Sequence, residues 1–219
     1  MASSQTITVT GIVKTDPKEK ENMFNKEKLD LTFAFAIEKQ IVPLGDDEKD
    51  TNESGWIFTS SSNASKQVRE TLKKGDRVLL TLKLTGAYKD GAYPSKFYLN
   101  CSYVQIITTS KATLNLYSGK ATIETVNKGV VEGTTDIFLK EAKAPTGTNK
   151  AKLDYSKPES YHYYRAVYNK DISSKLKSKQ TCFFTGTLFK GQVEETLSGN
   201  AGEDDKKKQP MVLLENIIF

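Results

Sequence analysis

Residues 68–84 recur 104 positions further along the chain, and this repeat restricts the possible folds more than any other feature. The apolar pair Val68 and Leu72 returns as Ile172 and Leu176. The alternating positions that follow return in the same register, from Val78 to Cys182, Leu80 to Phe184, Thr81 to Thr185 and Leu84 to Leu188. Chance rarely keeps helix spacing, strand spacing and the break between them in register. The sequence therefore predicts an internal duplication, with units at 1–110 and 111–219 and a linker at 108–113.

Two-residue alternation predicts the strands of the first unit, because successive side chains of a strand point to opposite faces. We expect strands one to five at 6–14, 29–38, 55–59, 78–84 and 97–107. Between strands three and four, the spacing of Val68 and Leu72 predicts a short amphipathic helix, capped by Asn63 and closed by Gly75. The densely charged stretches 16–28 and 45–54 are predicted as loops, and 88–93 as a hairpin tip.

The second unit is predicted to follow the same order. Its strands are expected at 120–127, 134–140, 161–168, 182–188 and 211–219, with a helix at 169–177 and surface loops at 142–158 and 190–209. Five strands with a helix between the third and fourth is the order of the OB-fold, a Greek-key barrel that commonly binds oligonucleotides. The predicted fold is mostly β: two tandem OB-fold five-stranded Greek-key barrels, each with a short helix between strands 3 and 4.

Catalytic motifs do not occur in the sequence, so we expect no enzymatic activity and no cofactor. The single histidine, His162, lies between two tyrosines and has no second histidine with which to share a metal ion. The chain contains no G-x-x-x-x-G-K-[ST], G-x-S-x-G or G-x-G-x-x-G pattern. Cys101 and Cys182 lie in apolar stretches far apart, which favours buried free thiols over a disulfide or a metal site.

Hydropathy and the amino-terminal sequence indicate the cellular location of the chain. The mean hydropathy is −0.51, and no apolar run approaches the ~18 residues that a membrane helix needs. Residues 1–6 carry neither the basic nor the apolar region of a secretory signal. We therefore expect a soluble cytoplasmic protein that does not contact membranes.

Aromatic side chains are the candidate ligand contacts, because an OB barrel binds single strands by stacking bases on aromatic rings. Trp56 lies in strand three, Tyr88 and Tyr93 lie on the hairpin between strands four and five, and Tyr161, Tyr163 and Arg165 share a face of the second strand three. Core packing is the alternative for Trp56 and simple exposure for the hairpin tyrosines. Because Tyr164 occupies the opposite face from Tyr161 and Tyr163, we expect one of these two sets on a surface.

Lysines are weaker evidence, because a solvated lysine needs no special function. The net charge is +5, and residues 1–110 hold 15 basic and 14 acidic groups. The candidate phosphate contacts are Lys14, Lys39, Lys83, Lys89, Lys96, Lys179 and Lys190. If several of them neutralise phosphates, the logarithm of the affinity falls with the logarithm of the salt concentration at about −0.7 per contact.

The first unit resembles the bacterial-type single-stranded DNA-binding proteins. The resembling run extends from Trp56 to Leu84 and is preceded by the apolar strand 33–37. The resemblance implies that Trp56 and Tyr88 stack on DNA bases. The family typically has a glycine in the middle of strand four, which this chain has as Gly186 but replaces by Leu82 in the first unit. Residues 213–219 read as a barrel strand where the family usually carries an acidic tail, so we expect no recruitment of partners through such a tail.

The sequence thus predicts a single-stranded DNA-binding protein without sequence preference, which protects single strands in replication, recombination or transfer of a mobile element. An RNA-binding module and a protein-binding scaffold are the alternatives. The family often assembles four OB units, so a homodimer of this chain would suffice, and a monomer that uses both barrels is equally compatible.

Overall fold

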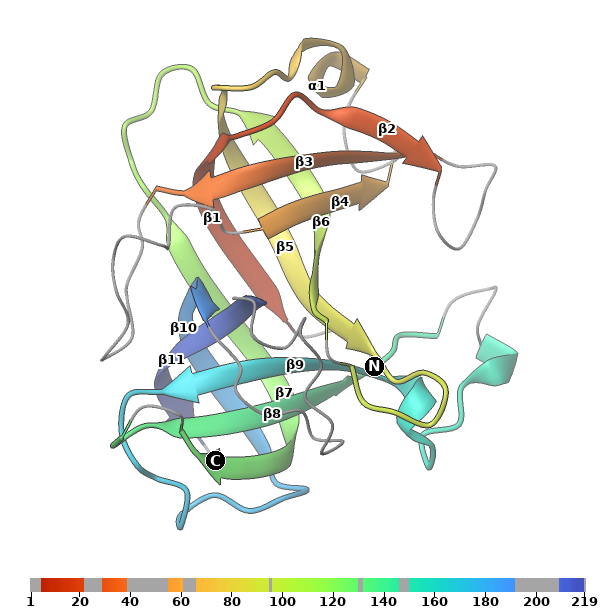
Figure 1. Ribbon diagram of the computed structural model, residues 1–219, viewed down its shortest axis with the longest axis vertical. Coiled ribbons are helices and arrows are strands. Elements are labelled where there is room, and N and C mark those ends of the chain that lie inside the picture. The colour runs from red at the N-terminus through yellow and green to blue at the C-terminus, as the bar shows by residue number, and fades with distance from the viewer. Residues whose placement is uncertain are drawn as a thin grey trace.

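The computed structural model is mostly β, and its strands pair into one continuous eleven-stranded sheet (Figure 1). It describes residues 5–21, 29–38, 55–60, 66–94, 96–129, 132–145, 150–191 and 209–218, without the side chains of 55–60, 66, 150, 190, 191 and 209. The first half contains β1 (Thr6–Val13), β2 (Lys18–Glu21), β3 (Leu29–Ile37), β4 (Gly55–Ser60), α1 (Lys66–Thr71), β5 (Arg77–Ala87) and β6 (Tyr98–Ile106). The second half contains β7 (Asn115–Lys128), β8 (Thr135–Ala142), the 3₁₀ turns η2 (Lys150–Lys152) and η3 (Pro158–Ser160), β9 (Tyr161–Tyr168), β10 (Thr181–Gly191) and β11 (Gln209–Ile218).

The strands of the first half close into a barrel. β1 pairs antiparallel with β3, and β3 pairs antiparallel with β4. β4 then runs parallel to β6, and β6 returns through β5 to β1. Alternate side chains of these strands fill the interior, among them the fully buried Ile7, Phe33, Leu80 and Leu99. The predicted alternation therefore identified the inward faces correctly.

The strands of the second half close in the same order, through β7, β8, β9, β11 and β10 back to β7. β5 and β10 have the same length, and their bounds differ by the 104 residues of the sequence repeat. Both strands also shift register at the same repeat position, between Thr81 and Leu82 and between Thr185 and Gly186. A β-bulge inserts one residue and bends a strand, so its recurrence at one position supports the duplication.

Two of the predictions for loops and helices are wrong. Residues 169–177 form turns where the repeat predicted a helix. Asp171 accepts hydrogen bonds from both the backbone and the hydroxyl of Ser173, which favours a turn over a helix. The predicted loop at 16–28 contains β2, whose four exposed residues pair with β3. The predicted loop at 142–158 connects β8 and β9, and its described part contains η2 and a hydrogen-bonded turn before η3. Asn63, the predicted cap of α1, lies outside the described residues, whereas Gly75 has the expected left-handed φ of 93°.

Direct strand pairing joins the two barrels, which Figure 1 shows stacked along the long axis of the molecule. β1 pairs antiparallel with β7, and the end of β5 pairs antiparallel with the start of β9. One contiguous cluster of buried side chains contains core residues of both halves. Cys101 and Cys182 are buried free thiols, as the sequence predicts. Because backbone pairs and a shared core connect the barrels, the β5–β6 hairpin has a defined position against the second barrel.

Candidate nucleic-acid interface

The hairpin that connects β5 and β6 lies against the second barrel at the junction of the two halves. Gly86 pairs with Tyr163 where the hairpin leaves β5. A side chain at Gly86 would lie only 2.7 Å from Pro94, so the absence of a Cβ allows the returning hairpin to pack closely. At the tip, Asp90 and Gly91 have φ values of 52° and 81°, as two-residue hairpin turns require. The hairpin predicted at 88–93 is therefore confirmed.

Six aromatic side chains pack together at this junction, and we call them the junction cluster: Tyr88, Tyr93, Phe97, Phe138, Tyr161 and Tyr163. Tyr93 is central, because its ring meets those of Tyr88 and Tyr163 edge-on at 5.2 Å and that of Phe138 at 5.7 Å. Phe138 and Tyr163 stack on each other at 5.5 Å. Such pairs contribute about 0.5–1.5 kcal/mol each beyond their buried area, so the cluster fixes the hairpin to the second barrel.

A short polar network borders the junction cluster. The Tyr93 hydroxyl donates a hydrogen bond to Glu124 Oε1 at 2.6 Å, and Lys140 Nζ lies 2.6 Å from Glu124 Oε2. This hydrogen bond, together with burial, raises the pKa of Tyr93 to about 12. Burial opposes ionisation of Glu124, but the hydrogen bonds from Lys140 and Tyr93 outweigh it and lower the pKa of Glu124. Lys140 Nζ also lies 5.0 Å from the ring centroid of Tyr161, within cation–π range.

The predicted aromatic contacts have different environments. Tyr88, Tyr93 and Tyr161 are half-buried, so each of them is partly accessible to solvent. Tyr163 is only 1% exposed and Tyr164 is fully buried, so within the set of Tyr161 and Tyr163 the expected surface position is wrong for Tyr163 and holds only for the partly exposed Tyr161. Tyr164 points into the second barrel, and the hairpin of the first half covers Tyr163 from outside. The sequence could not show this cover, because it comes from the other unit.

Arg165 and Trp56 complete the predicted aromatic and arginine set. Arg165 is half-buried beside the junction cluster, with its guanidinium 5.9 Å from the ring centroid of Phe138. The backbone of Trp56 lies in β4 opposite Ala34, and its side chain lies outside the described residues. The role of Trp56 in binding therefore stays a prediction.

The predicted lysines are spread over both barrels. Lys89 is 82% exposed at the hairpin tip, and Lys96 is exposed on the returning arm of the hairpin. Lys179 is exposed in the turn before β10, where it contributes to the electrostatic field at Glu124. Lys14 is exposed at the end of β1 and Lys83 is half-buried in β5. Lys39 and the side chain of Lys190 lie outside the described residues.

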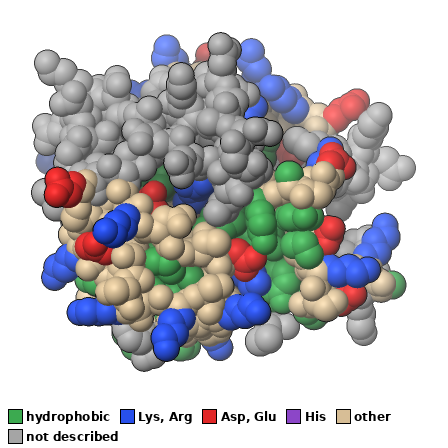
Figure 2. Space-filling view, turned by 60° about the horizontal axis from the view of Figure 1, so that its bottom comes forward, with side chains coloured by type: hydrophobic (Ala, Val, Ile, Leu, Met, Phe, Trp, Pro, Cys, Tyr) green, Lys and Arg blue, Asp and Glu red, His purple; other side chains and the backbone are tan. Residues whose placement is uncertain are grey.

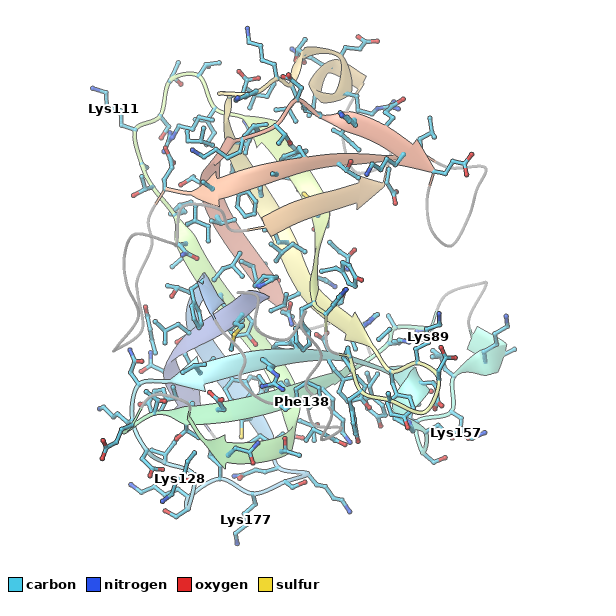
Figure 3. The ribbon with its side chains drawn as sticks, in the orientation of Figure 1. Lys89, Lys111, Lys128, Phe138, Lys157 and Lys177 are labelled. Atoms are coloured by element: carbon cyan, nitrogen blue, oxygen red, sulfur yellow. The ribbon has the colours of Figure 1, made fainter. Side chains whose placement is uncertain are left out.

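Three residues that organise this surface were not predicted from the sequence, namely Phe138, Glu124 and Lys140. Alternation alone places Phe138 and Lys140 on the outward side of β8, since Ile137 and Leu139 point into the barrel. An outward phenylalanine was therefore a usable signal. Figure 3 shows Phe138 over the β8–β9 region and Lys89 beyond the right-hand ends of these strands. Figure 2 shows hydrophobic side chains in a patch bordered by acidic and basic ones on the lower part of the molecule.

The residues that the structure describes contain neither a metal-binding group nor a membrane-spanning helix. No group of three His, Cys, Asp or Glu side chains in them could hold a metal ion. Their helices include none that is long and apolar enough to cross a membrane. His162 is half-buried, and burial together with the charges of Lys143 and Lys83 lowers its pKa to about 4. His162 is therefore neutral at pH 7, in agreement with a packing role.

Comparison with known proteins shows the fold alone. No protein-family model and no curated protein sequence matches the chain. Among solved structures, the fold is similar to that of the wild-type single-stranded DNA binding protein from Thermus aquaticus, with a TM-score of 0.60 and 12% sequence identity over 99% of this chain and 93% of that chain. A deletion mutant of the same Thermus protein gives a TM-score of 0.61 and 13% identity over 99% and 95% of the two chains.

Proposed function

We propose that the chain binds single-stranded DNA without sequence preference, through two OB-fold barrels formed by residues 1–110 and 111–219. It would act without catalysis or a cofactor, in the cytoplasm, and protect single strands during replication, recombination or transfer of a mobile element. The fold that the chain shares with the Thermus single-stranded DNA binding protein supports this proposal.

One observation carries the proposal: the β5–β6 hairpin and the outer face of β8 and β9 meet at the junction cluster. In an OB-fold, the face of strands two and three and the loop between strands four and five bind oligonucleotides. The β5–β6 hairpin is that loop in the first barrel, and β8 with β9 is that face in the second. A strand that crosses the junction would therefore meet binding elements of both barrels at once.

The half-exposed rings of the junction cluster suit this ligand class. Stacking on an aromatic ring contributes about 1–3 kcal/mol per base and tolerates any base. Tyr88 and Tyr161 offer such rings, while Tyr93 and Tyr163 hold the surface together. Lys89 and Lys96 on the hairpin are positioned for phosphates on the first-barrel side. Duplex DNA presents no base faces, so it would gain only the electrostatic part of the binding.

The fluorescence of the single tryptophan, Trp56, tests the proposal. We expect oligo-dT to quench it and duplex DNA to leave it unchanged at each of two salt concentrations. A mobility-shift assay with the same oligonucleotides provides an independent readout. No quenching and no shifted band with any nucleic acid would exclude the proposal and leave the protein-binding scaffold as the alternative. Equal binding of oligo-U and oligo-dT would assign the chain to RNA as well, because stacking alone does not distinguish the two sugars.

A homodimer with four barrels is the further part of the proposal, and a continuous outer sheet face supports it. β6, β5, β1, β7, β10 and β11 pair in succession across both barrels. Their outward positions include five large, exposed hydrophobic side chains: Tyr98, Tyr103, Leu116, Phe183 and Ile218. β5 and β6 correspond to β10 and β11 in the repeat, so the face has similar halves and suits the self-complementary contact of a two-fold dimer.

Analytical ultracentrifugation tests the dimer directly. We expect twice the chain mass for the wild type and the mass of one chain for Phe183→Lys, because Phe183 is 55% exposed on this face. A wild-type chain that sediments as a monomer would exclude the dimer without affecting the binding proposal.

A further inference from the structure

The segment between β8 and β9 carries an exposed tyrosine that extends the junction cluster. Tyr155 is 45% exposed, and its ring lies 6.2 Å from that of Tyr161 at an interplanar angle of 72°. Tyr161 in turn lies 6.5 Å from Tyr163, so a row of rings runs from this segment to the hairpin. Tyr155 could not be predicted as a binding residue from the sequence, because it lies in a polar stretch predicted as a surface loop.

Hydrogen bonds fix the orientation of both outer rings. The Tyr155 hydroxyl donates to the backbone oxygen of Lys143 at 2.9 Å, and the Tyr161 hydroxyl donates to the backbone oxygen of Tyr155 at 2.8 Å. The buried hydroxyl of Ser160 closes the turn beneath them, since it accepts from the Asp154 amide at 2.8 Å and donates to the Asp154 oxygen at 2.7 Å. A ring held in this way loses little further freedom when a ligand stacks on it.

Charged groups of both signs surround the two rings. Lys152 and Lys157 are exposed in the same segment, and Lys157 Nζ lies 3.8 Å from Asp154 Oδ2. Glu159 is also exposed. Figure 3 shows Lys157 and Lys89 on the same, right-hand side of the view. The lysines can approach a phosphate, but the two carboxylates offset them, so stacking is the larger attraction at this place.

We propose that Tyr155 and Tyr161 form a nucleobase subsite, in which an unpaired base of the bound strand stacks on the exposed face of Tyr155. The inference rests on the proposed function, because the strand reaches this subsite across the junction cluster. The subsite adds the β8–β9 segment to the binding surface, so the bound DNA strand would extend past the outer face of β8 and β9. A strand that occupies this subsite and the hairpin spans the two barrels.

Photo-crosslinking locates the bound base. Oligo-dT that carries 5-iodouracil is bound to the full chain and irradiated, and the crosslinked peptides are identified by mass spectrometry. We expect crosslinks at Tyr155 or Tyr161 that excess unlabelled oligo-dT suppresses. The mononucleotide of 5-iodouracil serves as the control for collisional labelling and should give none. A crosslink map without Tyr155 and Tyr161, obtained from a bound complex, overturns the subsite.

Two substitutions of Tyr155 separate stacking from structure. Tyr155→Leu keeps apolar bulk but removes the ring. We expect its affinity for oligo-dT to fall about 5- to 10-fold, which is the lower part of the affinity range that one stacked base contributes. Tyr155→Phe keeps the ring and loses only the hydrogen bond to Lys143, so it should bind within about 2-fold of the wild type. Unchanged affinity of Tyr155→Leu, with the wild type binding normally, contradicts the subsite alone. A wild type that binds no oligonucleotide contradicts the proposed function as well.

Discussion

The hydroxyl group of Tyr93 gives a sharp test of how the two barrels are joined. Tyr93→Phe keeps the three ring contacts of the junction cluster and removes only the 2.6 Å hydrogen bond to Glu124. Hydrogen bonds to charged groups contribute about 1.5–3 kcal/mol, and the half-buried position of Tyr93 reduces this to about 1–2 kcal/mol. For a chain of this length, that loss lowers the melting temperature by about 2–8 °C.

Thermal unfolding followed by circular dichroism measures this change, and Tyr103→Phe is the matched control. The Tyr103 hydroxyl donates to the exposed Gln105 side chain at 3.0 Å, so its removal should change stability by less than about 0.5 kcal/mol. A double substitution with Glu124→Gln should lose less than the sum of the two single losses, because the two groups act through one bond. Equal melting temperatures of Tyr93→Phe and the wild type would refute the reasoning.

The same bond predicts how stability depends on alkaline pH. The pKa of Tyr93 is raised in the folded chain from 10.0 to about 12, so the neutral hydroxyl is the form that folding favours. Its contribution is complete below pH 10 and is lost as the pH rises toward 12. Tyr93→Phe should therefore lose less stability than the wild type over this interval. Parallel pH profiles of the two proteins would mean that this hydroxyl is not linked to folding.

Three further substitutions test separate parts of the account. Burial raises the pKa of Asp136 to about 6, so the stability linked to its protonated form is lost as the pH rises through 6. In denaturant unfolding, Asp136→Asn should therefore stabilise the chain by ~2 kcal/mol at pH 8 and by little at pH 4. Gly186→Ala should lower the free energy of unfolding by at least about 2 kcal/mol in the same assay, because the added Cβ would overlap the Leu213 carbonyl oxygen at the bulge. An unchanged denaturation midpoint would contradict that packing. Trp56→Ala should weaken binding of oligo-dT by about 1–3 kcal/mol without unfolding the chain, as anisotropy and circular dichroism can show together; collapse of the fold would make Trp56 a core residue.

The strands could be predicted from the sequence because each signal is local. Alternation depends on neighbouring residues only, and it gave the positions of β3, β5 and β9 to within a few residues. The repeat fails at 169–177, where the apolar spacing of a helix persists but Asp171 and Ser173 form a turn. Leu176 is part of the buried core there, and Ile172 packs against it. The two units therefore share apolar packing at these positions but not helical geometry.

The candidate site could be predicted only in part, because it is assembled between units. Tyr88, Tyr93 and Tyr161 were found from their places on a hairpin and a strand. Their contact with one another depends on the pairing of β5 with β9, which no local pattern encodes. For the same reason Tyr163 was expected among the exposed residues, since its cover is a hairpin some 70 positions earlier in the chain.

The central claim is that the chain binds single strands by stacking together with a few phosphate contacts. Fluorescence anisotropy of labelled oligo-dT, titrated with the full chain at about 50 and about 200 mM salt, tests it most directly. With about four lysine contacts the slope is about −2.8, so the affinity should fall about 50-fold between the two conditions, and unlabelled duplex DNA should fail to displace the oligonucleotide. Binding that does not change with salt, or that duplex DNA displaces as well as oligo-dT does, would contradict the account.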